Sequence, residues 1–175
     1  KLATYHFVAN EEAAEVVAAM GEDRRRIKAI GSPDLDVILN NKPLELRGLI
    51  PFAPNDYGVF CYHPVTTLSS DEISRRALEV VTAADLSGEN VVVIMPNNDP
   101  GHYRIEVALR RFVGPRFYVQ RHLHFEAFLA VLRRAKFMLG NSSAGVREAP
   151  AFGVPSINVG SRQNGRYSCP GITDA

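Results

Sequence analysis

Residues 135–166 read AKFMLGNSSAGVREAPAFGVPSINVGSRQNGR, and this stretch decides the fold. It predicts a buried strand that ends at Gly140, a turn of small residues, a short helix and a second buried strand. Asn141, Ser142 and Ser143 are residue types that cap helix N-termini. A helix that begins there points unpaired N–H groups and the positive end of its dipole at a ligand. The stretch therefore predicts a phosphate or diphosphate cradle.

An ordinary strand–turn–helix with a polar N-cap is the alternative for this stretch, because neither a G-x-G-x-x-G nor a Walker pattern is present. Glu148 lies about one turn into the predicted helix, where its carboxylate could reach a ribose hydroxyl beside the cradle. Ser142 lacks the G-x-S-x-G setting of a serine nucleophile. The stretch by itself leaves a nucleotide site and a plain structural turn both open.

Upstream of this stretch, short apolar runs alternate with amphipathic segments. The predicted strands are YGVFCY at 57–62, NVVVIM at 90–95 and RFYVQ at 116–120, and the predicted helices cover 69–86, 99–113 and 124–135. Apolar strands that alternate with helices indicate βαβ units and a parallel sheet covered on both faces. Because crossovers are right-handed, we expect an α/β fold with a Rossmann-like lobe.

The first part of the chain is organised differently. A strand over 4–9, a helix from Asn10 to Gly21, a strand that ends at Ile30 and a helix over 34–41 precede a proline-rich segment without a clear period. We expect residues 1–42 to be the end of an N-terminal lobe, 43–56 an inter-lobe linker and 57–175 a nucleotide-binding lobe. Since the chain opens on Lys1, just before a strand, we expect it to be cut from a longer protein at both ends.

Composition argues against several classes of function. A formal net charge of +1 argues against a nucleic-acid or membrane surface held by bulk charge. No apolar run approaches the roughly 18 residues of a membrane span. Cys61 and Cys169 are the only cysteines, which argues against a disulfide framework and fits a reducing cytoplasm. His122 and His124 resemble a metal pair, but a third ligand at fitting spacing is missing, so we expect no metal.

Polar side chains follow every predicted strand of the second lobe. They lie at 63–67, 96–99, 121–124, 141–143 and 161–166. Since ligands of such sheets bind beyond the carboxyl ends of the strands, we expect these exits to converge on one rim. His63, held by Pro64, and Arg162 are residue types that suit a diphosphate. We expect Asp99 to be a helix cap, and a role as an acid or base is the alternative.

Four stretches together resemble the hydrolysing UDP-N-acetylglucosamine 2-epimerases, which include bacterial enzymes of the sialic-acid and legionaminic-acid pathways. They are KLATYHFVA at 1–9, YHPVTT at 62–67, MPNNDPG at 95–101 and GNSSAGVREAPAFGVPSINVGSRQNGR at 140–166. A histidine followed by PVTT points to the hydrolysing branch, because non-hydrolysing relatives carry a His-Arg-rich motif there. The resemblance stops at about Arg166, where YSCPGITDA replaces the family's acidic, glycine-containing segment.

The resemblance implies a two-lobed glycosyltransferase-B fold, of which this chain is the C-terminal half with the end of the first lobe. It implies elimination of UDP as a base removes the C2 proton, and then water addition that releases the free 2-epimer, such as N-acetylmannosamine. The implied site residues are His63 beside the leaving diphosphate as the catalytic residue, Asn97 and Arg162 in the nucleotide pocket, Leu123 at the uracil, Ser142 and Ser143 at the phosphates, and Glu148 at the ribose. The carboxylates that handle the C2 proton belong to the family's first lobe, upstream of Lys1.

The resemblance also implies a UDP-sugar substrate, no cofactor, no nucleic-acid or membrane partner, and a dimer or tetramer in the cytoplasm for the full-length protein. The fragment alone is expected to be inactive. A glycosyltransferase of the same fold, a non-hydrolysing epimerase and a non-enzymatic nucleotide-sugar sensor stay open as alternatives. The identity of the 2-acetamido sugar and the choice between UDP and GDP also stay open.

Overall fold

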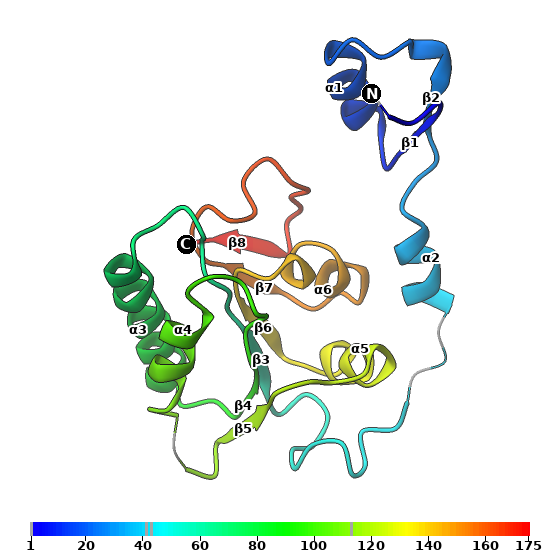
Figure 1. Cartoon of the computed structure of the whole chain (residues 1–175). Helices are drawn as coiled ribbons and strands as arrows, with labels where there is room; N and C mark the ends of the chain where they lie inside the picture. Colours follow the sequence, from blue (N-terminus) through cyan, green and yellow to red (C-terminus); the bar gives the residue numbers. More distant parts are fainter. Residues whose placement is uncertain (1, 41, 43, 113) are drawn as a thin grey trace. The chain divides into compact units, whose positions relative to one another are not determined.

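The computed structural model describes residues 2–40, 42, 44–112 and 114–175, and the chain divides into two compact units, Lys1–Asn41 and Lys42–Ala175 (Figure 1). In the first unit, β1 (His6–Val8) and β2 (Ile27–Ala29) pair in parallel. The remaining elements of this unit are α1 (Glu11–Ala19), the 3-10 turn η1 (Arg24–Arg26) and α2 (Pro33–Asn40). Asn10 caps α1, because its side chain accepts a hydrogen bond from the N–H of Ala13, which confirms the predicted helix start.

Six parallel strands build the second unit. They are β3 (Gly58–Cys61), β4 (Val91–Ile94), β5 (Phe117–Gln120), β6 (Phe137–Gly140), β7 (Ser156–Asn158) and β8 (Ile172–Asp174). Their order in the sheet is β5-β4-β3-β6-β7-β8. The chain therefore runs outward from β3 to β5, returns to the other side of β3 and continues to β8. This is the order of a Rossmann-like sheet, and the predicted α/β fold is confirmed.

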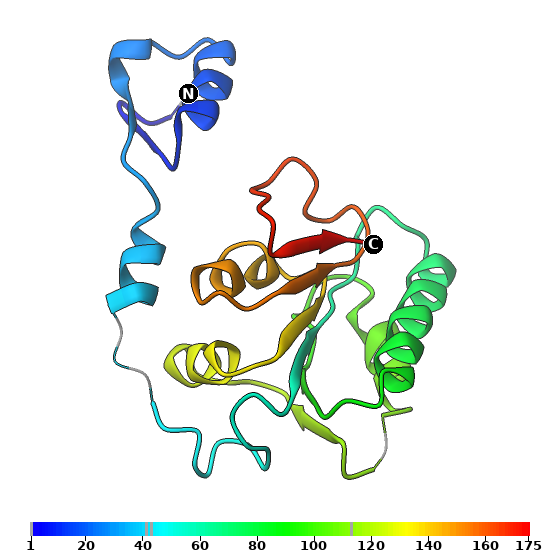
Figure 2. The ribbon, with the colours of Figure 1, turned by 180° about the vertical axis from the view of Figure 1, so that it is seen from behind.

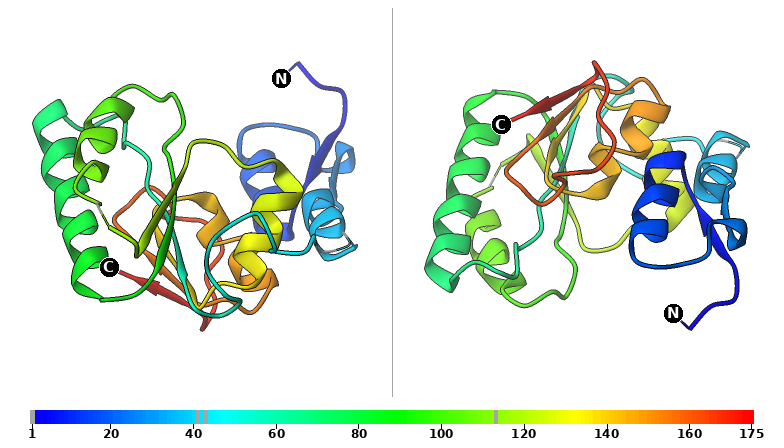
Figure 3. Two further views of the ribbon diagram at one scale, coloured as in Figure 1. Left: turned by 90° about the horizontal axis from the view of Figure 1, so that it is seen from below. Right: turned by 90° about the horizontal axis from the view of Figure 1, so that it is seen from above.

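Helices cover both faces of this sheet (Figures 1 and 2). One face carries α3 (Ser70–Leu86) and α4 (His102–Leu109), and the other carries α5 (Phe125–Arg133), the 3-10 turn η2 (Ser143–Gly145) and α6 (Glu148–Ala151). Successive residues of a strand alternate between the faces, so Phe60 packs in the core cluster of α3 and α4, whereas Val59 and Cys61 pack in that of α5. Figure 3 shows the sheet between these helical layers.

The helix predicted after Asn141 is wrong in its length. The structure has the three-residue turn η2, a break at Arg147, and the four-residue helix α6. Pro150 explains the break, because it has no N–H to donate to the carbonyl oxygen of Val146, four residues earlier. A turn of this length carries little of the dipole that the sequence pattern predicted.

The strand β8 was not predicted. It lies in the tail that follows Arg166 and pairs with β7, so that Ser156 faces Ile172 and Asn158 faces Asp174. A three-residue strand at a sheet edge carries almost no signal in its own sequence, and its pairing with a neighbouring strand fixes it.

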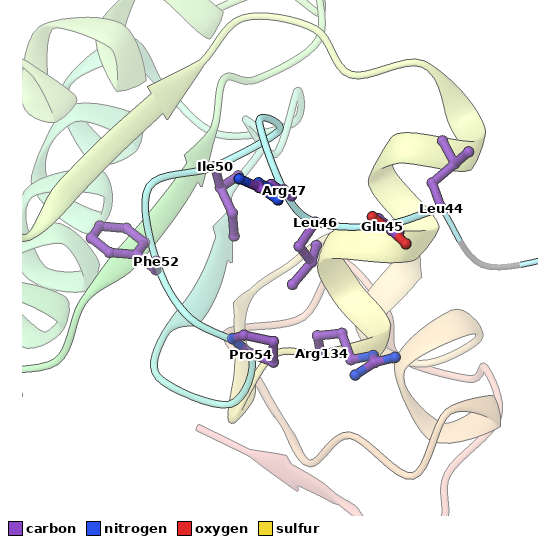
Figure 4. A pocket seen from close by; sticks show the side chains of 8 residues that line it. All are labelled: Leu44, Glu45, Leu46, Arg47, Ile50, Phe52, Pro54 and Arg134. Carbon is purple, nitrogen blue, oxygen red and sulfur yellow. The ribbon is translucent and has the colours of Figure 1, made fainter.

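In the part that the structure describes, the segment predicted as a linker belongs to the second unit and packs into its core. Ile50 is buried in the core cluster beside Tyr57, and Leu46, Leu49 and Phe52 pack against that cluster. A cavity of about 420 Å³ lies between this segment and the end of α5, and Figure 4 shows the side chains around it. Because the segment leads into the start of β3, the cavity lies at the amino ends of the strands. In the described residues, no helix combines the length and the apolar character needed to cross a membrane.

Candidate functional site

The predicted site residues gather where the strand order reverses, between β3 and β6. Cys61 and Gly140 are the last paired residues of these two strands. Gly140 has a φ of 141°, and a Cβ atom at this position would collide with the carbonyl oxygen of Cys61. Glycine is therefore required for β3 and β6 to approach each other at their carboxyl ends, which is where Rossmann-like sheets bind their ligands.

Asn141 joins the loops that follow three strands. This fully buried side chain holds both sides of the His63 residue: its Oδ1 accepts from the His63 N–H at 2.7 Å, and its Nδ2 donates to the His63 carbonyl oxygen at 2.8 Å. The Asn141 carbonyl oxygen accepts from Arg162 Nη1 at 3.2 Å and from Gln163 Nε2 at 2.7 Å. Sequence reasoning treated Asn141 only as a cap type and did not single out Gln163. The signal that could have identified Asn141 is a polar residue directly after a strand whose last three residues are buried.

Replacement of Asn141 by alanine is expected to lower the free energy of unfolding by about 2–4 kcal/mol, because two buried groups of the His63 backbone lose their partners. Urea denaturation of the chain measures this change. Asn164→Ala is the matched control, since Asn164 is exposed in the neighbouring loop. If Asn141→Ala lowers the free energy of unfolding no more than the control does, Asn141 does not hold the backbone of His63 in place as described.

The imidazole of His63 is neutral in this arrangement. Its Nδ1 contacts both the backbone N–H of Asn97 at 3.2 Å and Asn97 Oδ1 at 3.1 Å, and its Nε2 lies 3.4 Å from Cys61 Sγ. Burial lowers the pKa of His63 below its usual value of 6.5, and the positive charge of Arg162 lowers it further. Burial raises the pKa of the Cys61 thiol to about 11, so the thiol keeps its proton at neutral pH.

This lowered pKa predicts the direction of one pH dependence. Below about pH 6.5 the unfolded chain takes up a proton on His63 more readily than the folded chain does. The contribution of neutral His63 to the free energy of unfolding is therefore complete above about pH 6.5. It is lost as the pH falls through the lower pKa that His63 has in the folded chain. We expect urea unfolding between about pH 7.5 and 5 to show this decline, and His63→Gln to reduce the slope. An identical slope in that variant contradicts the prediction.

Asp99 connects the loop after β4 with the loop after β7. Its Oδ2 accepts from Asn97 Nδ2 at 2.8 Å and lies 3.8 Å from Arg162 Nη2. The predicted role as a helix cap is wrong, because α4 begins at His102 after Gly101, whose φ is 93°, with no side-chain cap. Polar contacts thus bring His63, Asn97 and Arg162 together, as the convergence of the strand exits predicts.

The turn formed by Ser142 and η2 offers fewer free backbone N–H donors than the sequence pattern predicted. The N–H of Ala144 donates to Ser142 Oγ at 3.4 Å, and the N–H groups of Gly145 and Val146 donate to the carbonyl oxygens of Ser142 and Ser143. The turn therefore uses the first amides itself, which corrects the expected row of unpaired N–H groups. Among the described residues, nothing accepts a hydrogen bond from the N–H of Ser142 or Ser143, so these two donors remain for a ligand.

Leu123 and Glu148 lie in two other elements of the same lobe. Leu123 precedes α5 and packs against its core cluster. Glu148 is the first residue of α6, and its Oε2 is a buried atom that accepts no hydrogen bond from any described residue. A buried carboxylate oxygen without a donor is costly. Neither residue has a polar contact with His63 in the described structure. Within the described ranges, no three His, Cys, Asp or Glu side chains are grouped so that they could hold a metal ion.

Comparison with known proteins gives one consistent result. The sequence model of the family described as UDP-N-acetylglucosamine 2-epimerase matches residues 1–172. The UDP-N-acetylglucosamine 2-epimerase of Neisseria meningitidis serogroup B is 43% identical over 95% of this chain and 45% of its own length. The hydrolysing UDP-N,N'-diacetylbacillosamine 2-epimerase of Legionella pneumophila is 33% identical over 99% of this chain and 47% of its own length.

A solved structure shows the same fold. The UDP-GlcNAc 2-epimerase of Methanocaldococcus jannaschii, in complex with UDP-GlcNAc and UDP, superposes with a TM-score of 0.72 at 14% identity, over 99% of this chain and 50% of that one. The chain thus spans about half the length of the relatives that it matches.

Proposed function

The chain belongs to the UDP-N-acetylglucosamine 2-epimerase family, and on this premise we propose that it is the nucleotide-binding half of an enzyme that eliminates UDP from a UDP-2-acetamido sugar. The observation that carries the proposal is the group formed by His63, Asn97 and Arg162, which Asn141 and Asp99 hold at the point where the strand order reverses.

The donors around this group suit a diphosphate. We assign the phosphates to the N–H groups of Ser142 and Ser143, to the Ser143 hydroxyl and to the guanidinium of Arg162, which is about a quarter exposed. We assign the ribose to Glu148, because its buried Oε2 lacks a donor. As the family resemblance implies, we assign Asn97 to the nucleotide pocket and the backbone at Leu123 to the nucleoside base.

The proposed chemistry breaks the bond between C1 and the β-phosphate oxygen. The electron pair of that bond stays on the departing UDP, while a carboxylate outside this chain removes the C2 proton and a 2-acetamidoglycal forms. The negative diphosphate favours protonation of His63, and the resulting imidazolium donates a proton to the departing β-phosphate and returns to the neutral imidazole, as a general acid. Burial keeps the pKa of His63 low before binding, and the negative charge of a bound diphosphate opposes that shift.

Water addition to the glycal would release the free 2-epimer and make the enzyme hydrolysing. The HPVTT motif that begins at His63 and the hydrolysing relative from Legionella support this outcome. The 43% identical relative from Neisseria carries a name without that qualifier, which favours a second candidate in which UDP adds back and the nucleotide sugar is retained. Both candidates share the elimination step and the residues assigned to it.

Two measurements test the proposal. Calorimetry of the 175-residue chain is expected to detect weak binding of UDP and no turnover, because the family resemblance assigns the carboxylates for the C2 proton to the first lobe. Mass spectrometry of products from the complete protein then distinguishes the candidates: UDP with free N-acetylmannosamine supports hydrolysis, and UDP-N-acetylmannosamine supports the second candidate. Transfer of the sugar to an added acceptor, or the absence of any turnover in the complete protein, contradicts both.

A further inference from the structure

Asp99 is linked to the imidazole of His63 through the side chain of Asn97. The carboxylate Oδ2 of Asp99 accepts a hydrogen bond from Asn97 Nδ2 at 2.8 Å, and the other end of the same carboxamide, Oδ1, lies 3.1 Å from His63 Nδ1. An ionised carboxylate only accepts hydrogen bonds, so the part of the amide that faces it is the nitrogen. The contact with Asp99 therefore fixes the amide oxygen of Asn97 toward the imidazole.

The loop that carries Asp99 is itself held in place. The carbonyl oxygen of Asp99 accepts from the N–H of His102, the first residue of α4, at 3.0 Å. Gly101 packs against Pro64, because a Cβ atom added to this glycine would lie 3.5 Å from Pro64 Cβ. Since Pro64 directly follows His63, the loop after β4 lies against the loop after β3.

The imidazole has a partner on Asn97 in either protonation state of Nδ1. An unprotonated Nδ1 accepts from the backbone N–H of Asn97 at 3.2 Å, and a protonated Nδ1 donates to the amide oxygen at 3.1 Å. Burial lowers the pKa of His63 and the charge of Arg162 lowers it further, whereas the contact with Asn97 and the charge of Asp99 oppose both. The nearby Cys61 thiol adds no charge at neutral pH, because burial raises its pKa to about 11.

We propose that Asp99 is a positioning residue that holds the amide oxygen of Asn97 against Nδ1 and so stabilises the imidazolium form of His63. The inference rests on the proposed function, in which this imidazolium is the general acid. Its Nδ1 proton stays bonded to Asn97, while Nε2 has only the weak contact with Cys61 Sγ at 3.4 Å. The Nε2 proton is therefore the one transferred to the departing β-phosphate oxygen, and the ring returns to the neutral form with its proton on Nδ1.

An NMR titration of His63 in the 175-residue chain, without nucleotide, tests the role of Asp99. The signal of His63 is the one that His63→Gln removes. Asp99→Asn removes the charge and keeps a side-chain oxygen for Asn97 Nδ2, whereas Asp99→Ala removes both. We therefore expect Asp99→Ala to lower the pKa of His63 more than Asp99→Asn does. The control Glu126→Ala removes an exposed carboxylate at the start of α5, on the same edge of the sheet, and should leave this pKa unchanged.

Kinetics of the complete protein give a second measurement. Asp99→Ala is expected to lower kcat at neutral pH about tenfold, since less of His63 is protonated, and to move the basic limb of the kcat–pH profile to lower pH. Asp99→Asn should restore part of kcat. The UDP affinity should not fall in either variant, because each removes a negative charge that lies 3.8 Å from the guanidinium of Arg162.

Three results overturn the inference. They are an unchanged pKa of His63 in Asp99→Ala, equal decreases in the two Asp99 variants, which assign the effect to charge alone, and a loss of UDP affinity as large as the loss of kcat, which indicates a merely structural role. The titration uses no nucleotide and no turnover. A complete protein without turnover therefore refutes the proposed function and not the contact, and an unchanged pKa in an active enzyme refutes only the role of Asp99.

Discussion

Replacement of His63 by alanine in the complete enzyme is expected to lower kcat by about 10²- to 10⁴-fold, the contribution of a positioned general acid. UDP affinity should change far less, because the phosphate contacts proposed for Ser142, Ser143 and Arg162 do not involve His63. In the proposed mechanism, the protonated imidazole of His63 stabilises the negative charge that develops on UDP only as the C1–O bond breaks. Steady-state kinetics and UDP calorimetry on the same preparation measure the two quantities.

His122→Ala is the matched control, since this histidine lies after β5 and has no contact with the His63 group in the described structure. It should leave both kcat and UDP affinity unchanged. If His63→Ala weakens UDP binding as much as it slows turnover, His63 is a binding residue and the general-acid role is wrong. The variant should also fold, because Asn141 holds the backbone of residue 63 and not its ring.

Replacement of Gly140 by alanine is expected to destabilise the lobe by more than about 4 kcal/mol, which few single substitutions reach. The added methyl group would collide with the carbonyl oxygen of Cys61, an atom of the neighbouring strand that cannot rotate away. Relief requires β3 and β6 to separate at the point where His63 and Asn141 leave them, so the chain should also lose its affinity for UDP. Urea denaturation and calorimetry measure these effects.

Gly153→Ala separates this collision from the general cost of a left-handed residue. Gly153 has a φ of 69°, and a Cβ atom there would meet nothing within 4 Å. Its replacement should cost only about 1–2 kcal/mol and leave UDP binding intact. Equal losses for the two variants would show that backbone conformation alone, and not the close approach of β3 to β6, explains the requirement at Gly140.

The sequence alone determined the elements whose signal is local. Apolar strands such as 57–62, alternating with capped amphipathic helices, were sufficient for a parallel α/β sheet, because burial on both faces demands that pattern. The side chains that follow these strands were sufficient to place His63, Asn97 and Arg162 on one rim, since parallel strands share the edge at which they end.

Only the tertiary structure decided which contacts hold that rim together. Asn141 bonds to residues 78 positions before it and 21 to 22 positions after it, and Asp99 joins two loops where its sequence suggested a helix cap. The edge strand β8 was likewise invisible in the sequence, since its pairing with β7 fixes it. Each of these features depends on partners far away along the chain, and a hydrogen bond between distant segments exists only once the strands have been packed side by side.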